Sequence, residues 1–292
     1  MRMTLLAIYG LVLATQVGFE PNENVVVIRP TEMKTTTGAT EPLTPGTTLT
    51  VQTVEADRLK VSAGRIGWLD SSVVIAADKA DAHFSTLIEK NSKDAVALLA
   101  RGKFRFDKGD HDAAIADLDQ SLKLSANSEA LTIRGFAWKR KGDKEKAMAD
   151  FNEAIKLNPK EALAWRVRGA TWAGKADYEK ALADYSQSIR LDPENPDSLH
   201  HRAIMLSVCM EDKIRNGTKA VEDATKACEV SGWKNPLYLT GLAIANAEKG
   251  DFDAAVKWQT KAMELSTEGR AKAMQEQLEQ FQMHKPLRRT WR

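Results

Sequence analysis

Apolar and polar positions along residues 95–267 follow the period of an α-helix, and short polar turns interrupt this pattern at regular intervals. Near copies of one turn begin at Gly109, Gly142, Ala176 and Gly250, at intervals of 33, 34 and 74 residues. Each copy starts with Gly-Asp or Ala-Asp. Glycine can end a helix in the left-handed conformation, and the aspartate side chain can cap the next helix. The pattern therefore predicts helical hairpins and a mainly α fold class.

Small and large side chains recur at fixed offsets from these turns. Small residues, where helices can cross closely, stand seven positions before and five after each turn: Gly102, Gly135, Gly169, Ala243 and Ala114, Ala147, Ala181, Ala255. Large apolar residues predicted to form the core are Leu98, Leu131, Trp165, Leu199, Leu239, Leu118, Phe151 and Tyr185. These offsets define five repeats, at 95–127, 128–161, 162–195, 196–235 and 236–267.

Two of the repeats depart from the pattern, and amphipathic segments flank the set. The turn of the fourth repeat is enlarged over residues 209–217, and the fifth repeat has Gln259 in place of a large apolar residue. Phe84, Leu87 and Ile88 predict a bridging or capping helix in 78–94. Residues 268–292 are predicted to hold a capping helix, with Ala271, Met274, Leu278 and Phe281 on one face, and a basic tail.

The repeats resemble the tetratricopeptide repeat. The match is fullest in 162–195, which has Trp165, Gly169, Tyr178, Ala181, Tyr185 and Pro193 at the places that the family pattern sets. The resemblance implies a right-handed superhelix of about five helical hairpins, completed by the capping helix. It also implies a protein that presents a surface to partners.

Residues 19–77 have a different pattern, with short β-type runs at 25–28, 48–54, 59–61 and 66–69 separated by Pro, Gly, Thr and Asp. Alternating apolar residues in these runs predict strands with one buried face, and so a small all-β barrel. Gly67-Trp68-Leu69, followed by 71–74, resembles the closing strands of a bacterial SH3-like domain. The resemblance permits binding of cell-wall peptides, while Trp68 itself is expected in the core.

The first residues suggest export. Arg2 is followed by a mostly apolar run that ends in Val12-Leu13-Ala14, which fits a signal peptide within 1–18, cleaved near residue 14. A mistaken start site or a buried N-terminal segment are the alternatives. The run is too short to span a bilayer and no other stretch is apolar enough, so we predict no transmembrane span. The signal-peptide pattern predicts a periplasmic or cell-envelope location.

Composition and spacing give no sign of an enzyme. Apolar residues make up 43% of the 292 residues, charged residues 28%, and the net charge of +2 does not call for nucleic acid. His200 and His201 are adjacent and point to different sides of a helix, so they do not form a chelating pair. We predict no catalytic residues, no metal and no cofactor. Cys209 and Cys228 should lie about 15 Å apart, which predicts two separate thiols and no disulfide.

A partner would bind the concave face, which the first helices line in the family that the repeats resemble. The groove positions that the family implies are Leu99, Lys103, Phe106, Thr132, Phe136, Lys139, Arg140, Arg166, Ala170, His200, Ile204, Thr240 and Ile244. Lys103, Arg140 and Arg166 would favour an acidic or phosphorylated peptide, and an ordinary solvated face is the alternative. Leu99 stands where some members have a carboxylate-binding lysine, which argues against that clamp.

These observations predict a non-enzymatic scaffold or adaptor that presents a groove to a partner peptide or protein. The alternative is an accessory protein that binds cell-wall (peptidoglycan) peptide through the SH3-like domain, with the repeats as a spacer.

Overall fold

The computed structural model describes residues 19–288, apart from residues 37, 39, 64 and 267–270. The predicted signal peptide and the end of the basic tail lie outside the described residues. The chain divides into two compact units, residues 1–153 and 154–292, here called the N-terminal and C-terminal units. None of the described helices combines the length and the hydropathy that crossing a bilayer requires.

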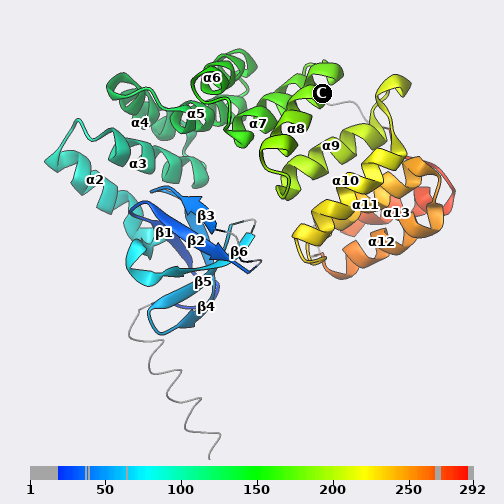
Figure 1. Ribbon diagram of the computed structural model, residues 1–292, viewed down its shortest axis with the longest axis horizontal. Coiled ribbons are helices and arrows are strands. Elements are labelled where there is room, and N and C mark those ends of the chain that lie inside the picture. Colours follow the sequence, from blue (N-terminus) through cyan, green and yellow to red (C-terminus); the bar gives the residue numbers. More distant parts are fainter. Residues whose placement is uncertain (1–18, 37, 39, 64, 267–270, 289–292) are drawn as a thin grey trace, which may run out of the picture. The chain divides into compact units, whose positions relative to one another are not determined.

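The N-terminal unit begins with a curled antiparallel sheet (Figure 1). Its seven strands follow the order β3-β2-β6-β5-β4-β1-β7. They are β1 (Asn24–Val27), β2 (Thr31–Thr35), β3 (Thr40–Leu43), β4 (Thr48–Glu55), β5 (Arg58–Ala63), β6 (Arg65–Asp70) and β7 (Val74–Ala76). The inner face buries a core that includes Val25, Met33, Val51, Leu59 and Leu69. The prediction of an all-β region before the repeats is confirmed.

Two strands and one side chain depart from the expectations for this region. The β-type runs indicate β1, β4, β5 and β6 but miss β2 and β3, because β2 is mostly polar and buries only Met33 and Thr35. The prediction that Trp68 belongs to the core is wrong. Side chains alternate between the faces of a strand, so the buried Leu69 leaves Trp68 half-buried on the outer face of β6.

The sheet packs against the first helices of the same unit. Val26 on the outer face of β1 shares an apolar cluster with Phe84 of α2 (Ala80–Lys90) and with Phe104 of α3 (Ala95–Asp107). The loop between β3 and β4 approaches α3 closely at Gly46, which has a φ of +84° and where an added Cβ would lie 2.4 Å from the carbonyl oxygen of Ala100. Only glycine allows both the backbone conformation and this contact.

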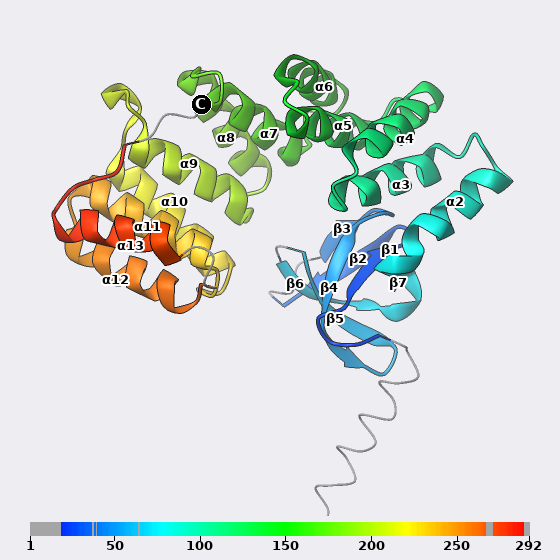
Figure 2. The ribbon, with the colours of Figure 1, turned by 180° about the vertical axis from the view of Figure 1, so that it is seen from behind.

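Pairs of adjacent helices follow in each of the five predicted repeats (Figures 1 and 2). The pairs are α3 with α4 (His111–Leu124), α5 (Ser128–Arg140) with α6 (Lys144–Leu157), α7 (Ala162–Ala173) with α8 (Tyr178–Leu191), α9 (Pro196–Val208) with α10 (Gly217–Val230), and α11 (Pro236–Lys249) with α12 (Phe252–Glu264). Helix α13 (Ala271–Gln282) packs on α12. The predicted fold class, helical hairpins with a capping helix after an all-β region, is confirmed.

The turns within the hairpins have the geometry that their sequence predicts. Gly109, Gly142 and Gly250 have φ angles of 85°, 88° and 90°, and Ala176 adopts the same left-handed conformation at 61°. The aspartate that follows caps the next helix; Asp110, for example, accepts a hydrogen bond from the backbone N–H of Ala113 at 3.1 Å. Because an L side chain is strained in this conformation, Ala176 is the least favourable of these turn residues.

The predicted core residues are buried, with one exception. Leu98, Leu118, Phe151, Tyr185 and Leu239 are each at most 2% exposed, and Leu131 and Leu199 are also buried. Trp165 is half-buried instead, and its indole Nε1 donates to the carbonyl oxygen of Pro159 at 2.9 Å. The polar edge of an indole requires such a partner, which favours a place at the margin of the core.

An arginine–aspartate pair, which was not expected from the repeat pattern, joins the two helices in four of the hairpins. The pairs, each bound through two hydrogen bonds, are Arg101–Asp117, Arg134–Asp150, Arg168–Asp184 and Arg202–Asp223. Three of these arginines also bond to the preceding helix pair or to α2, through Ser85, Asp119 and Ser186. The sequence signal was present, because each arginine directly precedes the small residue of its repeat.

The two atypical repeats are completed by polar contacts. In the enlarged turn, Arg215 donates to the carbonyl oxygen of Cys209 at 2.8 Å and to Glu248 of α11 at 2.9 Å. Arg288 of the tail also donates to Glu248, at 2.6 Å. Gln259 is fully buried, and its amide donates to the carbonyl oxygen of Met274 in α13 at 2.9 Å. The glutamine therefore joins the last hairpin to the capping helix.

The two cysteines are free and buried, and they lie in different apolar clusters. Burial raises the pKa of the Cys228 thiol to about 12. Both thiols therefore act as small apolar core residues.

Candidate partner-binding surfaces

In the N-terminal unit, the sheet already occupies the groove position of the first repeat. The ammonium group of Lys103 donates to the Oγ1 atoms of Thr44 and Thr47, at 2.7 and 2.8 Å, and to Glu129 at 2.6 Å. Thr48 donates to Asp107 at 2.8 Å, and burial raises the pKa of that carboxyl group. Lys103 was expected to contact a partner, but the β3–β4 loop accepts two of its hydrogen bonds and Glu129 of α5 accepts the third.

The remaining positions of this unit are divided between core and surface. Leu99 and Thr132 are buried and do not present a surface. Phe106 and Phe136 are half-buried with ring centroids 5.8 Å apart. Near them on α5, Lys139 is half-buried, and Arg140 is exposed. An aromatic pair with a cation close to it in the sequence is what this unit retains of the predicted groove.

In the C-terminal unit, Arg166 of α7 has unused hydrogen-bonding capacity. Its side chain is 17% exposed, and its Nη2 lies 3.8 Å from Asp197 of α9, which is too long for a hydrogen bond. The Nε atom is buried without a partner. Asp197 instead accepts a hydrogen bond from the hydroxyl of Tyr238 at 2.9 Å. Tyr238 thus binds the Oδ1 atom of Asp197, while the guanidinium group of Arg166 lies in a long ion pair with the Oδ2 atom.

His200 is buried and does not present its side chain to a partner. The imidazole is 9% exposed, and an added Cβ at Gly241 of α11 would lie 2.6 Å from its Nδ1. Burial lowers the pKa of His200 to about 3; His201 lowers it further and Asp197 opposes the shift. His200 is therefore a neutral buried residue, and its Nδ1 has no hydrogen-bond partner.

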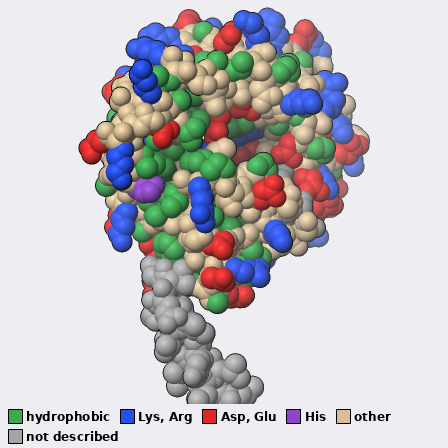
Figure 3. Space-filling view, turned by 60° about the vertical axis from the view of Figure 1, so that its left-hand side comes forward, with side chains coloured by type: hydrophobic (Ala, Val, Ile, Leu, Met, Phe, Trp, Pro, Cys, Tyr) green, Lys and Arg blue, Asp and Glu red, His purple; other side chains and the backbone are tan. Residues whose placement is uncertain are grey.

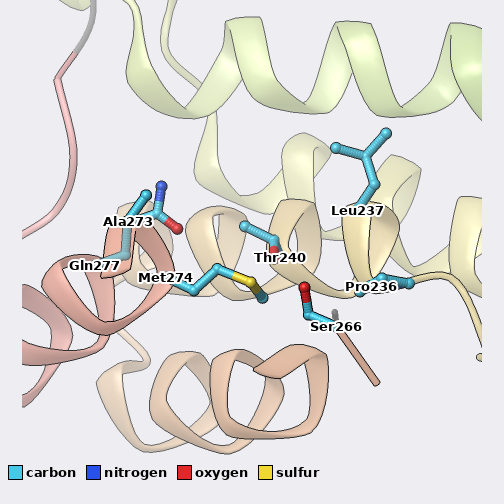
Figure 4. Close-up of a pocket in the computed structure, with 7 residues that line it drawn as sticks. All are labelled: Pro236, Leu237, Thr240, Ser266, Ala273, Met274 and Gln277. Carbon is cyan, nitrogen blue, oxygen red and sulfur yellow. The ribbon is translucent and has the colours of Figure 1, made fainter. Parts of the chain in front are cut away.

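The other predicted positions of this unit are mainly apolar. Ile244 is buried, Ile204 packs on the same apolar cluster, and Ala170 is half-buried beside Tyr185. Thr240 lines a pocket of about 190 Å³ between α11 and α13 (Figure 4). Its other lining residues are Pro236, Leu237, Ser266, Ala273, Met274 and Gln277. Leu237 is 41% exposed at its edge, so the pocket can take an apolar side chain.

Charged side chains of both signs are interspersed over the face of the molecule in Figure 3. On this face, a charged partner would therefore meet local groups and not one large field of a single sign. Among the described residues, no group of three or more His, Cys, Asp or Glu side chains is placed to hold a metal ion.

The helix pairs have the arrangement of tetratricopeptide repeats. The tetratricopeptide repeat family matches residues 77–129 and 128–161, and the second range coincides with the second predicted repeat. Proteins built from these repeats are generally scaffolds for protein–protein interaction, and no catalytic family is indicated. No curated protein matches the chain.

Solved structures share the fold at low sequence identity. In the crystal structure of the APC/C hetero-tetramer Cut9-Hcn1, one chain is similar with 15% identity and a TM-score of 0.60, over 71% of this chain and 40% of that chain. The structure of PilW, described as a widely conserved type IV pilus biogenesis factor, is similar with 16% sequence identity and a TM-score of 0.58. The similarity covers 68% of this chain and 90% of PilW. The structure of TTC0263, a thermophilic tetratricopeptide repeat protein of Thermus thermophilus, is similar with 18% sequence identity and a TM-score of 0.50. The similarity covers 64% of this chain and 97% of TTC0263. At these identities the likeness shows the fold alone.

Proposed function

We propose that this chain is a non-enzymatic scaffold whose C-terminal unit binds an acidic segment of a partner protein through Arg166. The observation that carries the proposal is the incompletely used guanidinium group of Arg166, with Nε unpartnered and Nη2 in a long ion pair, 3.8 Å from Asp197. A carboxylate accepts two parallel hydrogen bonds from an arginine, which makes Arg166 a suitable anchor for an aspartate or glutamate side chain.

Neighbouring apolar surface gives the same segment a second contact. Tyr238, which is bonded to Asp197, immediately follows Leu237 at the edge of the pocket between α11 and α13. An apolar side chain in this pocket, together with a carboxylate on Arg166, would select acidic segments that also carry a leucine-like residue. Interfaces commonly combine an apolar anchor with a few polar contacts in this way.

The test uses labelled peptides of the repeats Glu-Glu-Leu, Gln-Gln-Leu and Lys-Lys-Leu, each with a photo-reactive group, against the full chain. The Glu-Glu-Leu peptide is expected to crosslink within α7, α9 or α11. Arg166→Ala should weaken this binding about tenfold or more, since a hydrogen bond to a charged group contributes about 1.5–3 kcal/mol. Arg190→Ala is the matched control, because Arg190 is exposed on α8.

Two results would contradict the proposal. One is equal binding of the glutamine peptide at this unit, which would remove the role of charge. The other is unchanged crosslinking in the Arg166→Ala variant, which would place the site elsewhere.

The proposal also includes the fold type of the N-terminal sheet and the cellular location of the protein. The curled sheet is proposed to be a variant of the SH3-like barrel, supported by its consecutive antiparallel ladders from β4 to β6. Export to the cell envelope is supported by the N-terminal sequence. Fractionation of cells that produce the full-length protein tests the location, and recovery with the cytosol would contradict it.

A further inference from the structure

The outer face of the sheet has a tryptophan surrounded by cations. Trp68 of β6 lies opposite Lys34 of β2 on one side and Lys60 of β5 on the other. The Arg58 guanidinium lies 4.9 Å from the centroid of the indole ring, and the Lys60 ammonium 5.8 Å. Cation–π contacts of this kind hold both groups near the ring. The three cations and Trp68 are here called the Trp68 face.

None of these three cations forms an ion pair within the residues that the structure describes. Glu55 and Asp70 lie opposite Arg58 in the strand ladder, yet the Arg58 guanidinium lies over the ring. Asp70 accepts a hydrogen bond from the backbone N–H of Ser72 instead, and hydrogen bonding to Ser72 lowers the pKa of Asp70. The cations of the Trp68 face are therefore not held in ion pairs with the carboxylates of the described residues, although Glu55 and Asp70 lie nearby.

The fold does not need the Trp68 face for its core. Leu59, Val61 and Leu69, on the other face of the same strands, form the core. The indole Nε1 of Trp68 makes no hydrogen bond with any described residue, in contrast to that of Trp165. Ile66, two residues before Trp68 on β6, is 42% exposed. A large aromatic with a free donor beside an exposed aliphatic side chain is typical of a contact surface.

We infer that the Trp68 face is a second binding site, for an acidic protein segment that also carries an apolar side chain. Lys34 and Lys60 would bind carboxylates on the two sides of Trp68, while Ile66 and the indole edge would take the apolar side chain. The site is built from strands of the N-terminal unit alone, so it does not depend on the proposed role of Arg166.

The arrangement favours a protein segment over other anionic partners. Arg58 already lies over the Trp68 ring, so a nucleic-acid base would have to displace it in order to stack there. Glu32, Glu55 and Asp70 are exposed on the same sheet and would repel a phosphate backbone or an anionic membrane surface. A peptide, in contrast, can place single carboxylates beside Lys34 and Lys60, and its apolar side chain on Ile66.

The experiment repeats the binding assay in full-length protein that carries Arg166→Ala, so that the C-terminal site does not contribute. The photo-reactive Glu-Glu-Leu peptide is expected to crosslink to β2, β5 or β6. Lys34→Glu with Lys60→Glu should weaken its binding about tenfold or more. Lys93→Glu with Lys123→Glu makes the same change in net charge at exposed sites outside the Trp68 face, and should leave binding within about twofold.

A second variant and other ligands make the result decisive. Trp68→Ala should also weaken binding, while circular dichroism of the full chain stays that of the parent protein. A single-stranded oligonucleotide, phosphatidylglycerol vesicles and peptidoglycan sacculi are assayed in parallel. Tighter binding of any of these would overturn the assignment to an acidic protein segment. Equal peptide binding by the Lys34→Glu, Lys60→Glu variant would overturn the site itself.

Discussion

Removing Asp223 should destabilise the C-terminal unit far more than removing an exposed carboxylate. Arg202 donates to the two carboxylate oxygens of Asp223 at 2.7 and 2.8 Å. The Arg202 side chain is 15% exposed and that of Asp223 only 3%. Asp223→Ala therefore leaves a mostly buried guanidinium without its carboxylate.

The expected cost is about 2–3 kcal/mol. Breaking a buried ion pair by removing one partner typically costs about 3–5 kcal/mol. Arg202 keeps a hydrogen bond to Ser186 at 3.0 Å and is partly reached by water, so the lower part of that range or slightly less applies.

The last repeat indicates which replacement should be tolerated. Leu242 and Trp258 occupy the positions that Arg202 and Asp223 hold in the fourth repeat, and they pack in one apolar cluster. Arg202→Met with Asp223→Leu should therefore cost less than Asp223→Ala alone, because no charge is left buried.

Urea denaturation of the full chain, followed by circular dichroism and tryptophan fluorescence, measures the free energy of unfolding. Hydrogen exchange of α9 and α10 identifies where protection is lost. Glu264→Ala, which removes an exposed ion pair with Lys261, is the control and should cost less than about 1 kcal/mol. A cost for Asp223→Ala no larger than that of the control, or a double variant less stable than Asp223→Ala, would refute the reasoning.

Three further predictions test other parts of the fold. Ala176→Gly should raise the free energy of unfolding by about 1 kcal/mol in urea denaturation, because it relieves a left-handed φ of 61°; no gain would contradict this. Gly46→Ala should reduce hydrogen-exchange protection of α3, since its Cβ would meet Ala100, whereas Gly38→Ala, also at positive φ but with open space around it, should not. Burial lowers the pKa of His200 from 6.5 to about 3, so its contribution to stability is complete above pH 6.5 and decreases as the pH falls towards 3, by up to about 1.4 kcal/mol per pH unit. In the His200→Leu variant, denaturation curves measured across this pH range should show a shallower loss, and an equal slope would count against the buried neutral imidazole.

The candidate sites were only partly predictable from the sequence. Arg166 was among the expected groove residues, but Lys103 was too, and nothing in the sequence indicated that Thr44 and Thr47 would bind it. Trp68 was expected in the core, because a single aromatic in a short strand does not show by itself which face it occupies. The strand ladder decides this, since Leu69 is one position away and faces inward.

By itself, the sequence determined the helical hairpins, since their turns and small residues depend on local backbone conformation and on helix spacing. It also determined most of the core, because apolar residues at helical period must be buried together. Only the tertiary structure decided which polar groups were left for a partner. Arg202 is bound by Asp223, and Lys103 is bound by Thr44, Thr47 and Glu129. Arg166 forms only a long ion pair with Asp197, and Lys34 and Lys60 form no ion pair among the described residues. Whether a cation is bound within the fold depends on contacts between segments far apart in the chain, so it cannot be predicted from a local sequence pattern.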